Sequence, residues 1–166
     1  MKKWIIAALL TAAGTCFGQT ADWKFYKLDF VVKEVEGAKV LNSRAFSAVV
    51  QVDTPGMNSQ SGSIRAGSKV PVNGQYYDVG VNIDVQRVKE VQSGDLALSV
   101  SADLSSTAPE GGTPERPVIR QNRWSSYVVV PIKKPTVIFA SDDATSKHQL
   151  QLELTATPVS LGATMK

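Results

Sequence analysis

The sequence predicts an all-β protein whose antiparallel strands form a meander or a sandwich-like arrangement. The clearest evidence is a stretch from residue 77 to 85, in which apolar and polar side chains alternate strictly. A period of two places successive side chains on opposite faces of a strand, so this stretch predicts one apolar and one polar face. Clusters of Gly, Pro, Asn and Ser separate further extended stretches, and residues 19–166 contain no convincing amphipathic helix. The side chains predicted to face the core are Tyr77, Val79, Val81, Ile83 and Val85.

Alternation and turn residues predict the further elements along the chain. The predicted extended segments are 26–33, 39–52, 63–72, 77–91, 96–104, 123–132, 136–140 and 150–156. Segment 63–72 is either a short strand pair or one strand bent around Gly67. Turns are predicted at Glu36-Gly37, at Ser93-Gly94-Asp95 and around Pro135, and residues 54–62 form a loop. Residues 105–117 are predicted to be a long surface loop because they hold three prolines and two glycines.

The first 18 residues have the pattern of a secretory signal peptide. Lys2 and Lys3 precede an apolar run over residues 4–13, and small residues follow it. The run is shorter than the roughly 20 apolar residues that a membrane-spanning helix needs. Cleavage is expected after Gly18, and the alternatives are a buried N-terminal helix or a lipoprotein modified at Cys16. Residues 19–166 are then expected to form a single β domain.

Composition narrows the classes of function for that domain. Cys16 is the only cysteine, so a chain cleaved after Gly18 has no disulfide, no thiol nucleophile and no thiolate metal site. The formal charge of +3 falls to +1 when Lys2 and Lys3 are removed. This charge does not favour a nucleic-acid partner, and the aromatic residues do not form a base-stacking pattern.

Few side chains predict chemistry. The lone His148 is expected at the surface because one histidine without partners forms neither a metal site nor a catalytic triad. The Asp142-Asp143 pair predicts a solvated turn, with a calcium site as the alternative. Trp124 is expected to be half-buried, and otherwise to be a partner contact. The carboxylates of the 77–85 strand could take part in acid–base chemistry, but they are equally typical of the solvent-exposed face of a sheet. No catalytic residue, cofactor or metal is therefore predicted.

A series of short motifs resembles the secretin domain, which forms the outer-membrane ring of bacterial secretion and pilus systems. The strongest is the entry Lys69-Val70-Pro71 followed by Asp78-Val79-Gly80-Val81, which resembles the core signature of that family. Other segments follow in the family's order over residues 39–159: Lys39-Val40-Leu41-Asn42-Ser43-Arg44, Asp103-Leu104-Ser105, Pro117 with Arg123, Thr136-Val137 and Thr157-Pro158. The resemblance implies an antiparallel β-sandwich or a secretin-like sheet.

The sequence also departs from the family. Phe139-Ala140-Ser141 stands where secretins have a Gly-Gly-Leu that helps to shape the gate, and the family's N-terminal periplasmic modules have no counterpart. The function expected from the resemblance is non-enzymatic: a structural or assembly role in outer-membrane secretion or pilus-type machinery. The protein is expected in the periplasm or outer membrane of a Gram-negative bacterium, with copies of itself or secretion-machinery proteins as partners. The alternative is a soluble periplasmic β-sandwich that binds a protein or ligand and has no pore role.

Overall fold

The computed structural model describes residues 24–53, 61–113, 116–143 and 147–160. Within these residues the chain is all-β, and no helix is present. The predicted signal peptide and residues 54–60 of the predicted 54–62 loop lie outside the described residues, and Gly62 at the end of that loop begins β3. The strands are β1 (Phe25–Glu36), β2 (Lys39–Gln51), β3 (Gly62–Val72), β4 (Gln75–Glu90), β5 (Leu96–Thr113), β6 (Arg116–Val130), β7 (Thr136–Asp142) and β8 (His148–Val159).

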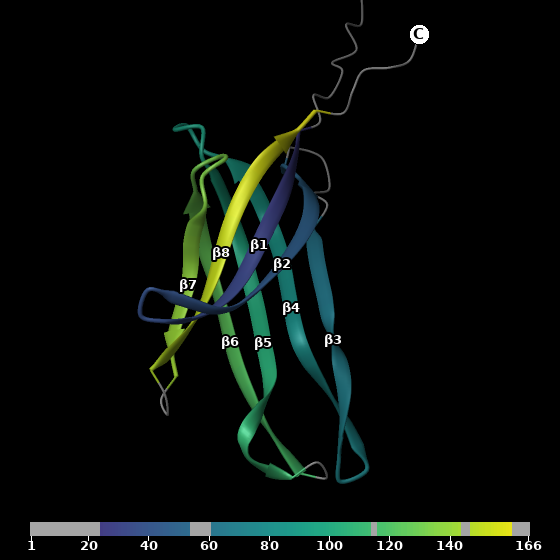
Figure 1. Cartoon of the computed structure of the whole chain (residues 1–166). Helices are drawn as coiled ribbons and strands as arrows, with labels where there is room; N and C mark the ends of the chain where they lie inside the picture. The colour runs from purple at the N-terminus through teal and green to yellow at the C-terminus, as the bar shows by residue number, and fades with distance from the viewer. Residues whose placement is uncertain (1–23, 54–60, 114–115, 144–146, 161–166) are drawn as a thin grey trace, which may run out of the picture.

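The strands form two antiparallel sheets of four, which pack face to face as a β-sandwich (Figure 1). Sheet A has the order β2-β1-β8-β7, and sheet B has the order β3-β4-β5-β6. Sheet B is a meander in which every strand pairs with its neighbour in the sequence. Sheet A needs one long-range pairing, between β1 and β8, to bring the two ends of the described chain together. The all-β, sandwich-like fold predicted from the sequence is therefore confirmed.

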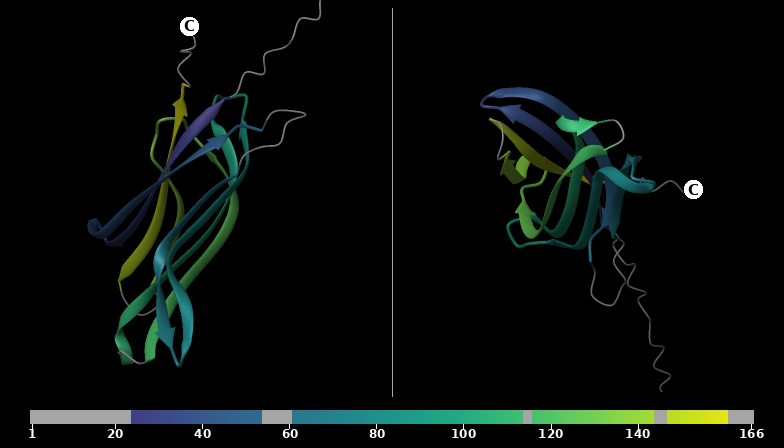
Figure 2. Two further views of the ribbon diagram at one scale, coloured as in Figure 1. Left: turned by 90° about the vertical axis from the view of Figure 1, so that its right-hand side faces the viewer. Right: turned by 90° about the horizontal axis from the view of Figure 1, so that it is seen from below.

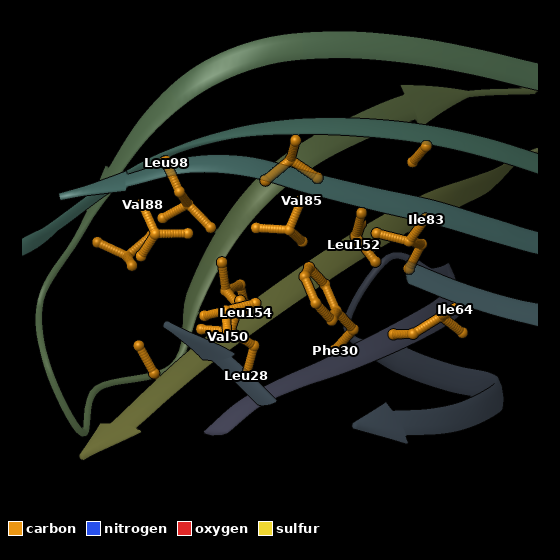
Figure 3. Close-up of a cluster of buried hydrophobic side chains, with 14 of the residues drawn as sticks. Leu28, Phe30, Val50, Ile64, Ile83, Val85, Val88, Leu98, Leu152 and Leu154 are labelled. Carbon is orange, nitrogen blue, oxygen red and sulfur yellow. The ribbon is translucent and has the colours of Figure 1, made fainter. Parts of the chain in front are cut away.

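The core lies between the upper parts of the two sheets, as Figure 1 is oriented. Sheet A contributes Leu28, Phe30, Leu152 and Leu154, which are fully buried. Figure 3 shows these side chains pointing toward those of sheet B, which come mainly from β3, β4 and β5. The sheet B side of the core consists of Ile64, Val81, Ile83, Val85, Val88, Leu96, Leu98, Val100, Ala102, Leu104 and Val130. Burial of this alternating set is the main source of stability for the fold.

Tight turns set the register of the β3–β4 and β1–β2 hairpins. Asn73 and Gly74 connect β3 to β4 with φ values of 51° and 80°, as a two-residue hairpin turn requires. Gly37 takes a φ of 57° in the predicted turn between β1 and β2. Segment 63–72 is one strand and not a strand pair, because all of β3 pairs with β4 from Gly62↔Val85 to Val72↔Gln75.

The prediction of a surface loop over residues 105–117 is wrong, because most of this stretch is strand. β5 continues to Thr113 and pairs with β6 beyond the predicted loop start, with Thr107↔Ile119 and Ala108↔Val118. Prolines and glycines are tolerated in this stretch because β5 has no pairing with β4 beyond Leu104 and is an edge strand there.

The predicted core face of β4 is only partly correct. Val81, Ile83 and Val85 are buried, as predicted, but Val79 is half-buried and Tyr77 is 46% exposed. The alternation runs from Tyr77 to Val85 and is broken by a bulge between Gln86 and Lys89. Within the alternating part, the side chains below Gly80 extend beyond the opposing sheet (Figure 1). Trp124 is half-buried as predicted, and its ring centroid lies 5.5 Å from that of Phe139.

Candidate functional site: a forked sheet and an open polar chamber

Sheet B divides into two parts at Gly80 and Ser105. Pairing between β4 and β5 extends from Glu90↔Leu96 to Val81↔Leu104 and ends there. The Ser105 hydroxyl then accepts a hydrogen bond from the Gly80 N–H at 3.0 Å. A side chain thus takes the place of the next ladder bond, and below this point β4 and β5 part. We call this point the fork.

Gly80 faces Gly67 on β3, and the two backbones approach closely. A Cβ on Gly80 would lie 2.2 Å from the Ala66 carbonyl oxygen and 2.4 Å from the Gly67 Cα. Gly80 also has a φ of 153°, which side-chain-bearing residues rarely adopt. The glycine is therefore required by the local backbone geometry, and this explains its place in the motif identified in the sequence.

Below the fork the molecule consists of two arms: residues 67–80 of the β3–β4 hairpin and residues 105–121 of the β5–β6 hairpin. Figure 1 and the view from below in Figure 2 show the arms apart and extending beyond sheet A. Tyr76, Tyr77 and Val118 on these arms are 72%, 46% and 43% exposed. Among the described strands, none pairs with the facing edges of β4 and β5 in this part.

A cavity of about 540 Å³ opens between the two sheets beside the fork. We call it the chamber. Its apolar floor is formed by Val32, Leu104 and Leu150, next to the hydrophobic core. Its walls are polar and include Glu34, Asn42 and Arg44 of sheet A and Ser106, Arg120 and Asn122 of sheet B.

A hydrogen bond within sheet A and an ion pair between the sheets line the chamber. His148 Nδ1 lies 2.9 Å from Glu34 Oε1, joining β8 to β1. Arg120 Nη1 donates to Asp143 Oδ2 at 2.7 Å, joining the arm of β6 to the residue that follows β7. His148 is the first residue of β8, and its side chain is 39% exposed. It is therefore accessible to solvent, as predicted, and it also lines the wall of the chamber. Asp142 ends β7 and accepts a hydrogen bond from Gln149, its partner on β8, so this aspartate of the predicted turn belongs to a strand.

The outer face of sheet B is exposed to solvent and carries two salt bridges. Arg65 Nη2 lies 2.7 Å from Asp84 Oδ1, and Arg123 Nη2 lies 2.9 Å from Asp103 Oδ2. Asp78, Asn82 and Asp84 share this face, as their alternation predicted. No group of three or more His, Cys, Asp or Glu residues in the described ranges could hold a metal ion.

The motif residues identified in the sequence fall into two groups. Those of the β3–β4 arm meet one another: Lys69 pairs with Asp78, Val70 lies opposite Tyr77, and Pro71 lies opposite Tyr76. Val79, Gly80, Val81 and Ser105 surround the fork. The remaining motif positions lie elsewhere, at Pro117 near the start of β6, Arg123 on the outer face, Thr136 and Val137 at the start of β7, and Thr157 and Pro158 at the end of β8.

The chamber walls were missed by sequence reasoning, although a signal for them exists. Leu28, Phe30 and Val32 follow a period of two on β1, and Glu34 continues that phase with a charged residue. Leu154, Leu152 and Leu150 lead in the same way to His148 on β8. A polar residue at a position where the alternation predicts an apolar one marks the level at which the core ends.

At the opposite end of the sandwich, one small cluster joins the two sheets. The Glu90 carboxylate accepts hydrogen bonds from Lys24 Nζ and from the Tyr26 hydroxyl, each at 2.6 Å. Desolvation, followed by the bond to Glu90, raises the pKa of Tyr26 to about 12. The hydrogen bonds from Lys24 and Tyr26 lower the pKa of Glu90 below its usual value. We call these three residues the upper clasp.

No helix in the described part of the chain is long and apolar enough to cross a membrane. Neither the protein-family models nor the curated proteins yield a match to this chain.

Solved structures to which the chain is similar include three secretins. The InvG secretin of the Salmonella SPI-1 type III secretion injectisome is 8% identical, with a TM-score of 0.44 over 87% of this chain and 66% of that chain. GspD of the Escherichia coli K12 type II secretion system is 11% identical, with a TM-score of 0.44 over 82% and 48%. The pilotin–secretin complex AspS–GspD of enterotoxigenic E. coli gives 10% identity and a TM-score of 0.47 over 84% and 48%.

The chain thus spans about two thirds of the InvG chain and about half of the chain in each of the other two. None of the three TM-scores reaches 0.5.

Proposed function

We propose that this protein is a non-enzymatic component of the bacterial envelope that acts by assembling with copies of itself, as part of outer-membrane secretion or pilus-type machinery. The observation that carries the proposal is the fork. Two long arms leave the body of the sandwich without pairing with each other, and their ends extend beyond sheet A, which reaches the β5–β6 arm only near Arg120 (Figure 1).

An uncovered arm is a poor structure for an isolated molecule. A two-stranded hairpin is at best marginally stable in water, and three or more strands with a buried face are needed for independent stability. Unpaired strand edges also expose rows of N–H and C=O groups that pair readily with another chain. The exposed Tyr76, Tyr77 and Val118 add apolar surface to these edges. A neighbouring subunit that pairs with the arms removes both liabilities.

The strand directions of sheet B suit repeated lateral pairing. Because all three pairings within the sheet are antiparallel, the outer strands β3 and β6 run in opposite directions. The β6 edge of one copy can therefore meet the β3 edge of the next as another antiparallel pair. Such a head-to-tail contact closes into a ring if the rotation between copies closes.

The sequence supports the cellular setting of the proposal. Residues 1–18 follow the signal-peptide pattern, and the ordered motifs over 39–159 resemble the secretin domain. Mass spectrometry of the protein from envelope fractions is expected to show an N-terminus near Gln19. An intact Met1 in those fractions would contradict export by cleavage.

Light scattering of the purified protein, with and without mild detergent, tests the assembly directly. We expect a mass many times that of one chain. A strictly monomeric species under both conditions would reject assembly.

A shortened arm provides the matched variant. Deleting Lys69, Val70, Tyr77 and Asp78 removes two complete cross-strand pairs and keeps both the Asn73-Gly74 turn and the alternation. Since these residues lie outside the core, we expect a folded, thermally stable variant with a smaller mass. An unchanged mass would show that the β3–β4 arm takes no part in assembly.

A second candidate function is a soluble periplasmic sandwich that binds a protein or ligand. The chamber is the specific observation that favours it, because a cavity of this size is within the range of small-ligand sites.

A further inference from the structure

The inner faces of the sheets change from apolar to polar at one level. On β1 the change is from Val32 to Glu34, and on β5 it is from Leu104 to Ser106. Within each sheet the change extends to the neighbouring strand, because Arg44 lies opposite Val32 and Asn122 lies opposite Leu104. The residues of both sheets then line the same chamber. Strands from both sheets therefore place polar side chains in the chamber. These side chains lie on the same strand faces that, further up, form the core.

Most charges in the chamber are already paired. Glu34 is held by His148, and Asp143 is held by Arg120. Arg44 differs, since no carboxylate of the described chain lies within ion-pair distance of its exposed guanidinium. The chamber thus offers one cationic group that can receive an anion without breaking an existing pair.

The surroundings of Arg44 select the kind of anion. Glu34, Asp142 and Asp143 line the same cavity, and their negative charge opposes a multiply charged anion such as phosphate. A single carboxylate matches the planar fork of one guanidinium and carries the smallest charge. The amides of Asn42 and Asn122 can pair with peptide groups, and the floor of Val32, Leu104 and Leu150 can cover an aliphatic side chain.

We propose that the chamber binds a carboxylate-bearing segment of polypeptide, with Arg44 as the anchor for the carboxylate. The site does not require assembly of the arms, since its groups belong to one chain. The carboxylate can come from a chain terminus or from an acidic side chain, and both present the same group to Arg44.

Fluorescence anisotropy with three rhodamine-labelled pentapeptides tests the proposal on the purified protein. The first is penta-alanine with a free C-terminus, the second is the same peptide amidated, and the third is amidated with a central glutamate. We expect the amidated neutral peptide to bind about 10- to 100-fold more weakly than at least one carboxylate peptide, as expected for a charge-assisted hydrogen bond. The stronger of the two carboxylate peptides identifies the source.

Variants of the chain locate the site. Arg44→Gln is expected to weaken carboxylate binding by the same factor, while Arg123→Gln on the outer face leaves it unchanged. Asn122→Asp, which adds a negative charge to the chamber, is expected to weaken binding as well. Thermal unfolding of each variant shows that it is folded.

Three results would overturn the proposal: no binding by any of the peptides, equal binding of the amidated and carboxylate peptides, or unchanged binding in folded Arg44→Gln. Light scattering of the same samples separates this result from the assembly proposal, because a monomer that binds peptide retains the chamber site and rejects only the ring.

Discussion

The upper and lower parts of sheet B are built from the same strands but have different surroundings. In the upper part, Ile83 and Val100 are completely buried against sheet A. In the lower part, Tyr77 continues the phase of Ile83 on β4 but remains 46% exposed. The same alternation thus gives a core in one half and an uncovered arm in the other. What differs is the reach of the opposing sheet.

The boundary between the two parts is sharply marked. Gly80 and Ser105 end the β4–β5 ladder, and the chamber begins beside them. Above this level the inward side chains are mainly apolar, and at its lower boundary they include Glu34, Arg44 and Asn122. The inward face of each of these strands therefore changes from apolar to polar residues along its sequence. That these changes lie at the same height becomes visible only when the two sheets are packed together.

The largest contrast is expected from a charge placed inside the upper part. Val81→Asp or Ile83→Asp buries an unpaired carboxylate at a cost of several kcal/mol, which is comparable with the whole stability of many domains. Asn82→Asp, on the opposite face of the same strand, should be tolerated. Thermal or urea unfolding followed by circular dichroism measures all three, and equal stabilities would show that the faces of β4 are assigned wrongly.

A smaller effect is expected at the boundary itself. Gly80→Ala places a Cβ against the Ala66 carbonyl at a positive φ, so we expect a loss of about 1–3 kcal/mol. Gly74→Ala in the hairpin turn also has a positive φ, but no atom lies within 4 Å of its Cβ position. Urea unfolding of the two variants should therefore rank Gly80→Ala as the more damaging, and the reverse order would argue against a close approach at the fork.

Removing the hydroxyl at the fork is expected to cost less. Ser105→Ala leaves the Gly80 N–H without its acceptor, with a loss of about 1 kcal/mol. Hydrogen exchange should then show faster exchange of the Gly80 amide, while amides in the upper part of β4 keep their protection. Ser101→Ala, on the exposed outer face of β5, is the control.

The smallest effects concern pH and the upper clasp. Because the pKa of Glu90 is lowered in the folded state, its contribution is present above the unfolded value near 4.3 and is lost as pH falls through the folded pKa. Because the pKa of Tyr26 is raised to about 12, its contribution is present below pH 10 and is lost between about pH 10 and 12.

Stability measured against pH in Glu90→Gln and Tyr26→Phe separates the two groups. Glu90→Gln should lose the acid-dependent part, which we expect to be at most about 1 kcal/mol for a partly exposed ion pair. Tyr26→Phe should lose the alkaline part. If both variants keep the pH profile of the parent protein, the clasp does not couple the sheets.

Much of the fold follows from local sequence patterns. The alternation at 77–85, the turns at Glu36-Gly37 and Ser93-Gly94-Asp95 and the late strands each appear near their predicted positions. These features depend on neighbouring residues in the chain, so the sequence alone is sufficient to predict them. The prediction of a loop over 105–117 failed because proline and glycine are compatible with a strand that has a free edge, and edge status is not visible locally.

The sequence by itself thus determined the all-β class, most of the strands and the apolar face of clearly alternating strands such as 77–85. Only the tertiary structure decided which apolar residues become core, since this depends on where β1 and β8 end relative to β4 and β5. It also decided that Glu34, Arg44 and Asn122, far apart in the sequence, share one chamber, and that Gly80 and Ser105 meet at the fork. Periodicity is a property of a single strand, whereas burial and site formation require the position of the opposing sheet, and that position is set by long-range pairing.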